Sequence, residues 1–362
     1  MRVPFQNLAA DNTQFVTSFL DELSCTVSSG QYIDGPQVHA LEAELAEYLD
    51  VPEVVTVNSG TDALRLSLEA LGIGKGHEVI VASYSFVATT AVVASVGATP
   101  VFADCGLEDF TIDVKHVQRL INARTRAIIP VHLFGNVADV EGIHHLAKAQ
   151  KIKIVEDCAQ AFGARNENGF AGTMGDTGAF SFYPTKVLGG LGDGGAICTK
   201  DASLALHLRR LRNHGQDSNG VVKHLGHNSR LDEMQAAMLR VKLLQIDKAI
   251  ESRRRIAETY RTNLSGCDLK LPLLTQRVFS QFVIRTKMRD QLAAYLAKRG
   301  IETRCYYTLP CHKIPAFHDP SQSLELPHTE ELARTSLALP IYTSLTEALV
   351  MEICKSIQEF FA

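Results

Sequence analysis

The feature that most constrains the fold is a regular alternation of short apolar runs with segments of helical apolar spacing. The apolar runs, which we interpret as strands, lie at residues 54–57, 78–82, 100–104, 127–131 and 152–156. The helical segments between them lie at residues 63–71, 88–96, 114–121 and 140–149. This rhythm predicts a mostly parallel sheet with helices on both faces. Functional groups of such sheets gather where the strands end, at their carboxyl edge.

A single lysine stands on a glycine-rich loop between two further predicted strands. Residues 179–182 form one apolar run, Pro184 ends it, and Lys186 follows. Five glycines then fall within residues 189–195, before the next apolar run. A lysine that is withdrawn from water loses proton affinity and becomes a nucleophile toward carbonyl groups. The alternative is an ordinary glycine-rich turn whose lysine points into solvent.

Two other predicted strands end in polar groups. The run at 54–57 leads into Asn58-Ser-Gly-Thr-Asp62 and a helix, where a serine or threonine can cap the helix and Gly60 permits a close approach. A helix N-terminus after a strand also suits an anion, so capping and anion binding are both open. Asp157 follows the run at 152–156, where an unpaired buried carboxylate would be costly. It either caps a following helix or faces a cationic ring nitrogen.

The C-terminal third predicts a second, smaller domain. After a polar loop at residues 213–226, which we expect to be mobile, one long helix is expected from about Met234 to Leu264. Further strands are expected at residues 278–284 and 301–307, and further helices at 290–298 and 346–361. We therefore divide the chain into a large domain, residues 1–249, and a smaller α+β domain, residues 250–362.

Composition limits the classes of function. The 362 residues are 46% hydrophobic, enough for a large core, and the formal charge of −4 gives no support for a nucleic-acid or membrane-surface partner. No apolar run is long enough to span a bilayer, and we expect no signal peptide. The eight cysteines form no C-x-x-C pair and the 13 histidines are scattered, so we expect reduced thiols, a cytoplasmic location and no metal site.

The lysine, the aspartate and the glycine-bearing helix start match the needs of one cofactor. Pyridoxal 5'-phosphate needs an amine to form an imine, a carboxylate to keep its ring nitrogen protonated and donors for its phosphate. Five motifs in this chain also resemble, in the same order, those of the DegT/DnrJ/EryC1/StrS family of sugar-nucleotide aminotransferases. The motifs are Asn58-Ser-Gly-Thr-Asp-Ala-Leu64, Ser85-Phe-Val-Ala-Thr89, Val155-Glu-Asp-Cys-Ala-Gln-Ala161, Phe180-Ser-Phe-Tyr-Pro-Thr-Lys186 and Gly226-His-Asn-Ser-Arg-Leu-Asp-Glu233. The resemblance implies the α/β fold of type I pyridoxal-phosphate enzymes, with a mostly parallel seven-stranded sheet in the large domain and a smaller α+β C-terminal domain.

The resemblance implies two catalytic residues. Lys186 would form the imine with the cofactor and then carry the proton between the substrate carbon and the cofactor carbon, and Asp157 would pair with the ring nitrogen. Gln160 would donate to the phenolate oxygen of the ring, and Phe86 would stack on its face. Because family members with His in place of this lysine are dehydratases, Lys186 favours amine transfer.

The resemblance also implies a set of binding residues and a homodimer. Gly60, Thr61 and Ser181 would donate to the phosphate, and Asn228 of the partner subunit would reach the same phosphate, so that two subunits share each active site. The residues that we place near the substrates are Tyr183, Arg230, Tyr306, Tyr307 and His312.

The run Leu188–Gly195 is similar to the form found in family members that act on 3-keto sugars. The resemblance therefore implies transfer from L-glutamate to a dTDP-linked 3-keto-6-deoxyhexose, giving a dTDP-3-amino-3,6-dideoxyhexose. Alternative acceptors are a UDP-linked 3-keto sugar, a 4-keto-6-deoxy sugar nucleotide and a keto-inositol. The alternative to an enzyme is a regulatory protein that holds the cofactor. The segment Arg304–His312 departs from the family pattern at Tyr306, Thr308 and Cys311, where selectivity for the sugar is expected.

Overall fold

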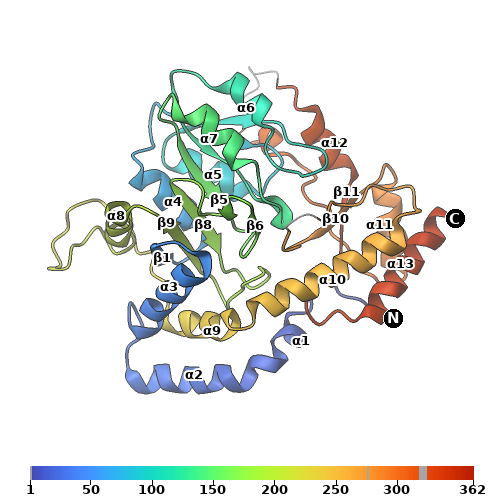
Figure 1. Cartoon of the computed structure of the whole chain (residues 1–362), viewed down its shortest axis with the longest axis horizontal. Coiled ribbons are helices and arrows are strands. Elements are labelled where there is room, and N and C mark those ends of the chain that lie inside the picture. The colour runs from blue at the N-terminus through green and yellow to red at the C-terminus, as the bar shows by residue number, and fades with distance from the viewer. Residues whose placement is uncertain (1, 275–276, 318–323) are drawn as a thin grey trace.

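The structure is a computed structural model and describes residues 2–274, 277–317 and 324–362. Its centre is a seven-stranded sheet in the spatial order β1-β9-β8-β5-β4-β2-β3 (Figure 1). The strands are β1 (Glu53–Val57), β2 (Glu78–Ala82), β3 (Thr99–Ala103), β4 (Thr125–Ile129), β5 (Lys153–Asp157), β8 (Thr177–Ser181) and β9 (Gly195–Thr199). Within this sheet only β9 runs antiparallel to its neighbours, so the predicted mostly parallel sheet is confirmed.

Helices cover both faces of this sheet, as the alternating pattern predicts. On one face lie α4 (Gly60–Ala70), α5 (Val87–Ser95) and α8 (Ala202–Arg212). On the other face lie α3 (Pro36–Leu49), α6 (Val114–Leu120), α7 (Val140–Lys148) and α9 (Glu233–Leu243). Val54 packs into the cluster that contains α3, whereas its neighbour Val55 packs into the cluster that contains α4. Strands covered on both faces are apolar on both sides, which explains their continuous apolar runs.

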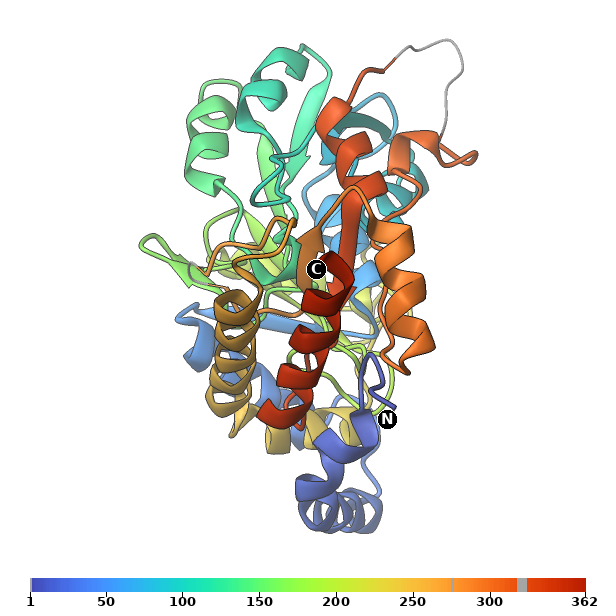
Figure 2. The same ribbon diagram turned by 90° about the vertical axis from the view of Figure 1, so that its right-hand side faces the viewer.

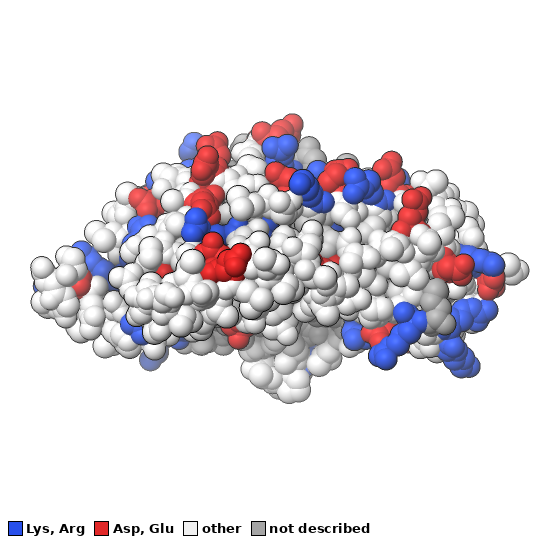
Figure 3. All heavy atoms as spheres, turned by 90° about the horizontal axis from the view of Figure 1, so that it is seen from below, with Lys and Arg blue, Asp and Glu red and all other residues white. Residues whose placement is uncertain are grey.

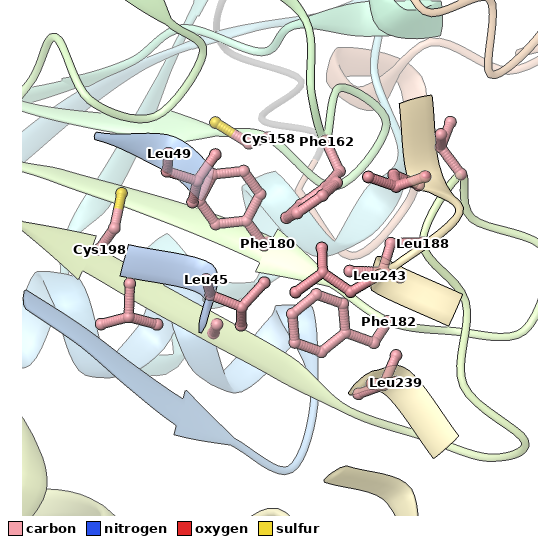
Figure 4. Packing of buried hydrophobic residues seen from close by; sticks show 14 of the residues in the cluster. Leu45, Leu49, Cys158, Phe162, Phe180, Phe182, Leu188, Cys198, Leu239 and Leu243 are labelled. Carbon is pink, nitrogen blue, oxygen red and sulfur yellow. The ribbon is translucent and has the colours of Figure 1, made fainter. Parts of the chain in front are cut away.

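The core beside the lysine loop, which we define as residues 183–194 between β8 and β9, is tightly packed (Figure 4). Phe180 and Phe182 both meet Phe162 in T-shaped contacts, with ring centroids 5.6 and 6.4 Å apart. Leu45 of α3 lies in the same cluster. Full burial of one such side chain contributes about 1.5–3 kcal/mol. The chain is therefore firmly positioned where it enters the lysine loop.

The C-terminal part of the chain has a core of its own (Figure 2). Its elements are α10 (Ile246–Leu264), β10 (Phe282–Arg285), α11 (Arg289–Lys298), α12 (Pro327–Thr335), β11 (Ser336–Leu339) and α13 (Glu347–Phe361). β10 pairs antiparallel with β11, and α10, α11 and α13 contribute to the same apolar cluster. Val3 joins this cluster through a bridge to Ile301, and the predicted domain boundary at residue 249 stays a prediction.

Two strands expected in this part are wrong in extent. The strand expected at residues 278–284 begins only at Phe282, because Phe279 adopts a positive φ of 46° that interrupts extended backbone. No strand element forms at residues 301–307, where Ile301 and Arg304 make isolated bridges only. Short elements that the sequence did not indicate are β6 (Arg165–Asn166), β7 (Gly169–Phe170), α12, β11 and the 3-10 turns Leu133–Gly135 and Cys311–Lys313.

The single long helix expected from Met234 to Leu264 is two helices. α9 ends at Leu243 and α10 begins at Ile246, and Gln245 between them has a φ of −117°, outside the helical range. Leu244 continues the apolar pattern of the sequence but is 82% exposed. Because α9 packs on the large sheet and α10 packs in the C-terminal core, the break lets the chain change direction between the two cores.

Two N-terminal helices, α1 (Leu8–Asn12) and α2 (Val16–Ser29), lie below the sheet in Figure 1. Phe19 of α2 packs against Met238 of α9. The apolar side chains that α2 exposes are Val16, Leu20 and Val27. The view from below shows a broad area with few charged side chains (Figure 3). Among the described residues, no helix is both long enough and apolar enough to cross a membrane.

A buried carboxylate joins the start of α9 to the start of α3. Glu233 is 1% exposed and accepts hydrogen bonds from the N–H groups of Gly35 at 2.9 Å, Gln37 at 2.8 Å and Val38 at 2.9 Å. These donors lie at a helix N-terminus, where N–H groups lack partners within the helix and the dipole favours a negative charge. A side chain from a distant part of the sequence therefore caps α3.

Replacing Glu233 with alanine should destabilise the protein by about 2–4 kcal/mol, because it leaves buried N–H groups without acceptors. Urea unfolding followed by circular dichroism measures the change. The matched control is Glu251→Ala, at an exposed position on α10, which should change stability by about 0.5 kcal/mol or less. Equal unfolding midpoints for the two variants would contradict the role of Glu233 as a cap.

Candidate active site

The lysine loop is fixed by its own turn and by α9. The N–H of Lys186 donates to the carbonyl of Tyr183 at 2.9 Å. From α9, Lys242 donates from Nζ to the carbonyl of Gly189 at 2.6 Å, and Gln235 accepts a hydrogen bond from a loop N–H at 3.0 Å. A Cβ at position 189 would lie 2.5 Å from a carbonyl oxygen of the same loop, so this turn requires glycine. Neither α9 residue was predicted, because nothing in the local sequence shows which helix reaches the loop.

Asp157 is buried and Lys186 is half-buried. Asp157, the last residue of β5, is 5% exposed; its Oδ2 accepts from Thr89 Oγ1 at 2.7 Å and its Oδ1 accepts from the N–H of Ala159 at 3.1 Å. Burial raises the pKa of Asp157, and these two hydrogen bonds and the charge of Lys186 partly offset that effect. Burial lowers the pKa of Lys186, and attraction to Asp157 partly offsets it. Lys186 is therefore not a fully exposed turn residue, and its catalytic role stays a prediction.

Asp157 does not cap a helix, which was one of its two interpretations. After β5 the next regular elements are β6 and β7, and the next helix is α8. The parallel pairing of β5 with β8 sets Asp157 opposite Ala179, two positions before Ser181 ends β8. The carboxylate therefore lies at the edge of the sheet from which the lysine loop departs.

The start of α4 offers donors for an anion. Ser59 is the N-cap, and its Oγ accepts from the N–H of Asp62 at 3.1 Å. Among the described residues, the N–H groups of Gly60 and Thr61 have no hydrogen-bond partner. A Cβ on Gly60 would lie 2.6 Å from Cβ of Ser181, so glycine lets the helix start touch the end of β8. Free N–H groups together with the helix dipole suit a phosphate.

An aromatic group borders the site on the side of the C-terminal part. Phe86, at the N-cap of α5, is 55% exposed, and its ring centroid lies 6.4 Å from that of Tyr307. Gln160 donates from Nε2 to the Tyr307 hydroxyl at 3.0 Å and accepts at Oε1 from the N–H of Phe134 at 2.8 Å. One N–H of the Gln160 amide is left for another acceptor. Tyr307 thus links Phe86 and Gln160 to the C-terminal part of the chain.

Asn228 and Arg230 line one hollow together with Ser59, the cap of α4. Arg230 donates from Nη1 to Oδ1 of Asn213 at 2.9 Å, and its Nε is buried without a partner among the described residues. Tyr183, on the lysine loop, is 51% exposed. Asn228 and Arg230 therefore lie near the α4 start of their own subunit, and the contact of Asn228 with the phosphate of a partner subunit stays a prediction.

Tyr306 and His312 have different surroundings. The ring of Tyr306 packs against Phe134 at 6.1 Å, and its carbonyl accepts a hydrogen bond from the Tyr84 hydroxyl. His312 is 5% exposed and shares a 2.7 Å hydrogen bond between Nδ1 and Ser83 Oγ. It lines a hollow beside β3 that contains none of the predicted cofactor-binding residues. The substrate contacts of both residues stay predictions.

Glu156, next to Asp157 in β5, is a buried support that the sequence did not indicate. Its carboxylate accepts from three N–H groups within residues 172–175 at 2.6–2.9 Å and shares a 2.9 Å hydrogen bond with Nε2 of His132. Together with Cys158 these residues are of metal-ligating types. Because four donors already occupy the carboxylate, we interpret the group as a brace for the strand end that carries Asp157.

These residues fit pyridoxal 5'-phosphate. A buried carboxylate near a half-buried amine suits the ring nitrogen and the aldehyde of the cofactor, and the free donors of α4 suit its phosphate. The site lies at the carboxyl end of parallel strands in a sheet covered by helices on both faces. Fold and site together define the class of pyridoxal-phosphate-dependent enzymes of fold type I.

Comparison with known proteins specifies the family. The model of the DegT/DnrJ/EryC1/StrS aminotransferase family matches residues 14–358. A dTDP-3-amino-3,4,6-trideoxy-alpha-D-glucose transaminase from Streptomyces venezuelae is 40% identical, covering 99% of this chain and 96% of its own. A pleiotropic regulatory protein from Geobacillus stearothermophilus is 38% identical, covering 100% and 99%. A UDP-N-acetyl-3-dehydro-alpha-D-glucosamine 3-aminotransferase from Acidithiobacillus ferrooxidans is 41% identical, covering 98% and 97%.

Solved structures agree with this assignment. The crystal structure of S. venezuelae DesV in complex with a ketimine intermediate has a TM-score of 0.96 at 40% identity, covering 99% of this chain and 98% of that one. The structure of NtdA from Bacillus subtilis with bound cofactor PMP has a TM-score of 0.94 at 30% identity, covering 99% and 85%. The chain therefore belongs to the DegT/DnrJ/EryC1/StrS aminotransferase family, and it is an aminotransferase that depends on pyridoxal phosphate.

In the apoenzyme, Lys186 should react with trinitrobenzenesulfonate at a lower pH than an exposed lysine such as Lys355, because only the neutral amine reacts and burial lowers the pKa of Lys186. Asp157→Asn removes the charge that raises this pKa, so the midpoint of the rate-against-pH curve should move to still lower pH. Peptide mapping by mass spectrometry measures both rates in one digest. A midpoint that is the same in the variant and the wild type would contradict the coupling of the two residues.

Proposed function

We propose that this aminotransferase moves an amino group from L-glutamate to a dTDP-linked 3-keto-6-deoxyhexose, giving a dTDP-3-amino-3,6-dideoxyhexose. The observation that carries the proposed chemistry is the largely buried Lys186 near the buried Asp157. The run Leu188–Gly195 and the name of the S. venezuelae relative support a dTDP-linked sugar that is aminated at carbon 3. The eight cysteines are free thiols, which supports a reducing, cytoplasmic location.

The bound cofactor supplies an aldehyde that exchanges amino groups and a ring that withdraws electrons from the reacting carbon. Lys186 would hold the aldehyde of the cofactor. Once released, its Nζ would accept the proton from the substrate carbon and donate it to the cofactor carbon. Its lowered pKa favours the neutral form that can accept this proton. Asp157, oriented by Thr89, would hold the ring nitrogen.

The remaining predicted residues would position the cofactor and the substrates. The proposed donors to the phosphate are Gly60, Thr61, Ser181 and Asn228. The ring would be contacted by Phe86 and Gln160. The proposed substrate contacts are Tyr183, Arg230, Tyr306, Tyr307 and His312. The exposed rings of Phe86 and Tyr183 and the hollow beside Arg230 support a second subunit over this edge. We therefore propose a homodimer in which Asn228 serves the active site of the partner.

A mixed dimer made of one Lys186→Ala subunit and one Asn228→Ala subunit should regain activity that each variant lacks on its own. If Asn228 acts across the interface, a dimer of Lys186→Ala with Asn228→Ala contains one site that has both residues. The two variants are coexpressed with different tags, and the mixed dimer is purified and assayed. Each variant alone is the control. A mixed dimer that is as inactive as its parents would show that Asn228 acts within its own subunit.

The acceptor is tested by absorbance, because the cofactor's visible band changes when an amino sugar donates its nitrogen. The holoenzyme is titrated with a dTDP-3-amino-6-deoxyhexose, with its UDP counterpart and with a dTDP-4-amino sugar. Loss of the band with the first compound alone is expected. A response only to the UDP compound would favour a UDP-linked 3-keto sugar as acceptor, as the name of the A. ferrooxidans relative suggests. A response only to the 4-amino sugar would place the amination at carbon 4. A protein that binds cofactor but responds to no amino sugar would favour the regulatory alternative.

Lys186→Ala should lose turnover by about three orders of magnitude or more, because no other group is proposed to move the proton. Turnover is followed by formation of 2-oxoglutarate from glutamate. Lys355→Ala, on the exposed side of α13, is the matched control and should keep normal turnover. Substantial turnover of Lys186→Ala would contradict the proposed role of this lysine.

A further inference from the structure

A second hollow adjoins the lysine loop. It is lined by α1, by residues 184–187 of the loop, by both sides of the break between α9 and α10, and by Tyr342 and Thr343. Figure 1 shows α1 close to that break. The hollow shares Lys186 with the candidate active site, but none of the other predicted cofactor-binding residues lines it. Its volume is ≈ 220 Å³, below the range of about 300–1,000 Å³ of sites for drug-sized ligands, so its occupant must be smaller than a sugar nucleotide.

The wall of this hollow carries an excess of positive charge. Apart from Lys186, the lining includes the cations Lys242, Lys248 and Arg253 and the single carboxylate of Asp11, which leaves two positive charges uncompensated. Asp11 is itself engaged, since its Oδ1 accepts from the N–H of Ser344 at 2.7 Å. Two uncompensated charges in a small enclosure favour a ligand with two negative charges.

Hydrogen-bond donors of two of these cations are incompletely used. Arg253 is 6% exposed and donates from Nη1 to the carbonyls of Phe279 at 3.3 Å and Ile341 at 3.1 Å, but its Nε is buried without a partner among the described residues. Lys242 has three donors and spends one on Gly189. Burial lowers the pKa of Lys242 to about 8, the charge of Arg253 adds to this effect, and attraction to Asp11 offsets only part of it. A buried donor without an acceptor is costly, so Nε of Arg253 is available to a ligand or to an ordered water molecule in this hollow.

We propose that this hollow is a binding site for a small dicarboxylate, separate from the cofactor pocket. One carboxylate would accept from Arg253 and Lys242, and the other would reach Lys248 at the open side. Because Lys242 also holds Gly189, the occupant would contact the anchor of the loop that carries Lys186. Glutamate and 2-oxoglutarate, the amino donor and its product in the proposed reaction, are small dicarboxylates. The identity of the natural ligand therefore rests on the proposed function. The binding itself does not require transamination.

Succinate tests the site without depending on the reaction, because it has neither an amino nor a keto group. The holoenzyme is titrated with succinate by calorimetry, in the wild type and in Lys242→Gln, Lys248→Gln and the control Lys355→Gln. Lys248 and Lys355 are exposed, so neither change threatens folding, and glutamine at 242 keeps an amide donor on a side chain one bond shorter than lysine. We expect one succinate per chain, about tenfold weaker binding in each of the first two variants and unchanged binding in the third.

Two results would overturn the proposal. One is the absence of succinate binding at millimolar concentration, or equal affinity in all four proteins. The other is competition between succinate and the amino-sugar nucleotide with a change in the cofactor's visible band, which would place succinate in the cofactor pocket. Either result leaves the proposed aminotransferase function standing, because the amino-sugar titration is read independently.

Discussion

The candidate site depends on keeping a carboxylate and an amine away from water at one edge of the sheet. Each group loses hydration worth several kcal/mol, and their attraction compensates only where both are firmly positioned. Position comes from the sheet: parallel pairing sets Asp157 of β5 opposite Ala179 of β8, and the chain after β8 turns into the lysine loop. Thr89 and Ala159 then satisfy the carboxylate. Strand register therefore decides where the chemistry can occur.

α9 is the second constraint, because it supports elements that are remote from one another in the sequence. At its start Glu233 caps α3, and further along Gln235 and Lys242 hold the lysine loop. α3 and α9 also enclose the aromatic cluster from which the loop departs. Removing the side chain of Glu233 or Lys242 would leave a buried backbone group unpaired. The lysine loop is therefore held by fixed partners although it is rich in glycine.

The sequence predicts those parts of the structure that neighbouring residues decide. Strand Glu78–Ala82 has the predicted bounds, and helices Val114–Leu120 and Val140–Lys148 end within one residue of the predicted position, because caps and apolar periodicity are local signals. The lysine loop and Asp157 are recognisable because their motifs are contiguous. Contacts between distant segments leave no such signal. The partner of Gly189, the interruption of a strand by Phe279 and the break at Gln245 are set by tertiary packing.

The break between α9 and α10 matters for function because the two cores meet there. α9 carries the anchors of the lysine loop, and α10 enters the C-terminal core, where Arg253 donates to the carbonyl of Ile341. The hydrogen bond between Gln160 and Tyr307 is one of several further links between the same two parts, together with those of Tyr84 to the Tyr306 carbonyl and of Ser83 to His312. A shift of one part against the other would strain these bonds and the apolar cluster that both parts share. The break between α9 and α10 lies beside the lysine loop, and the bond between Gln160 and Tyr307 lies beside the proposed site of the cofactor ring. A movement of the C-terminal part would therefore also move the amine of Lys186.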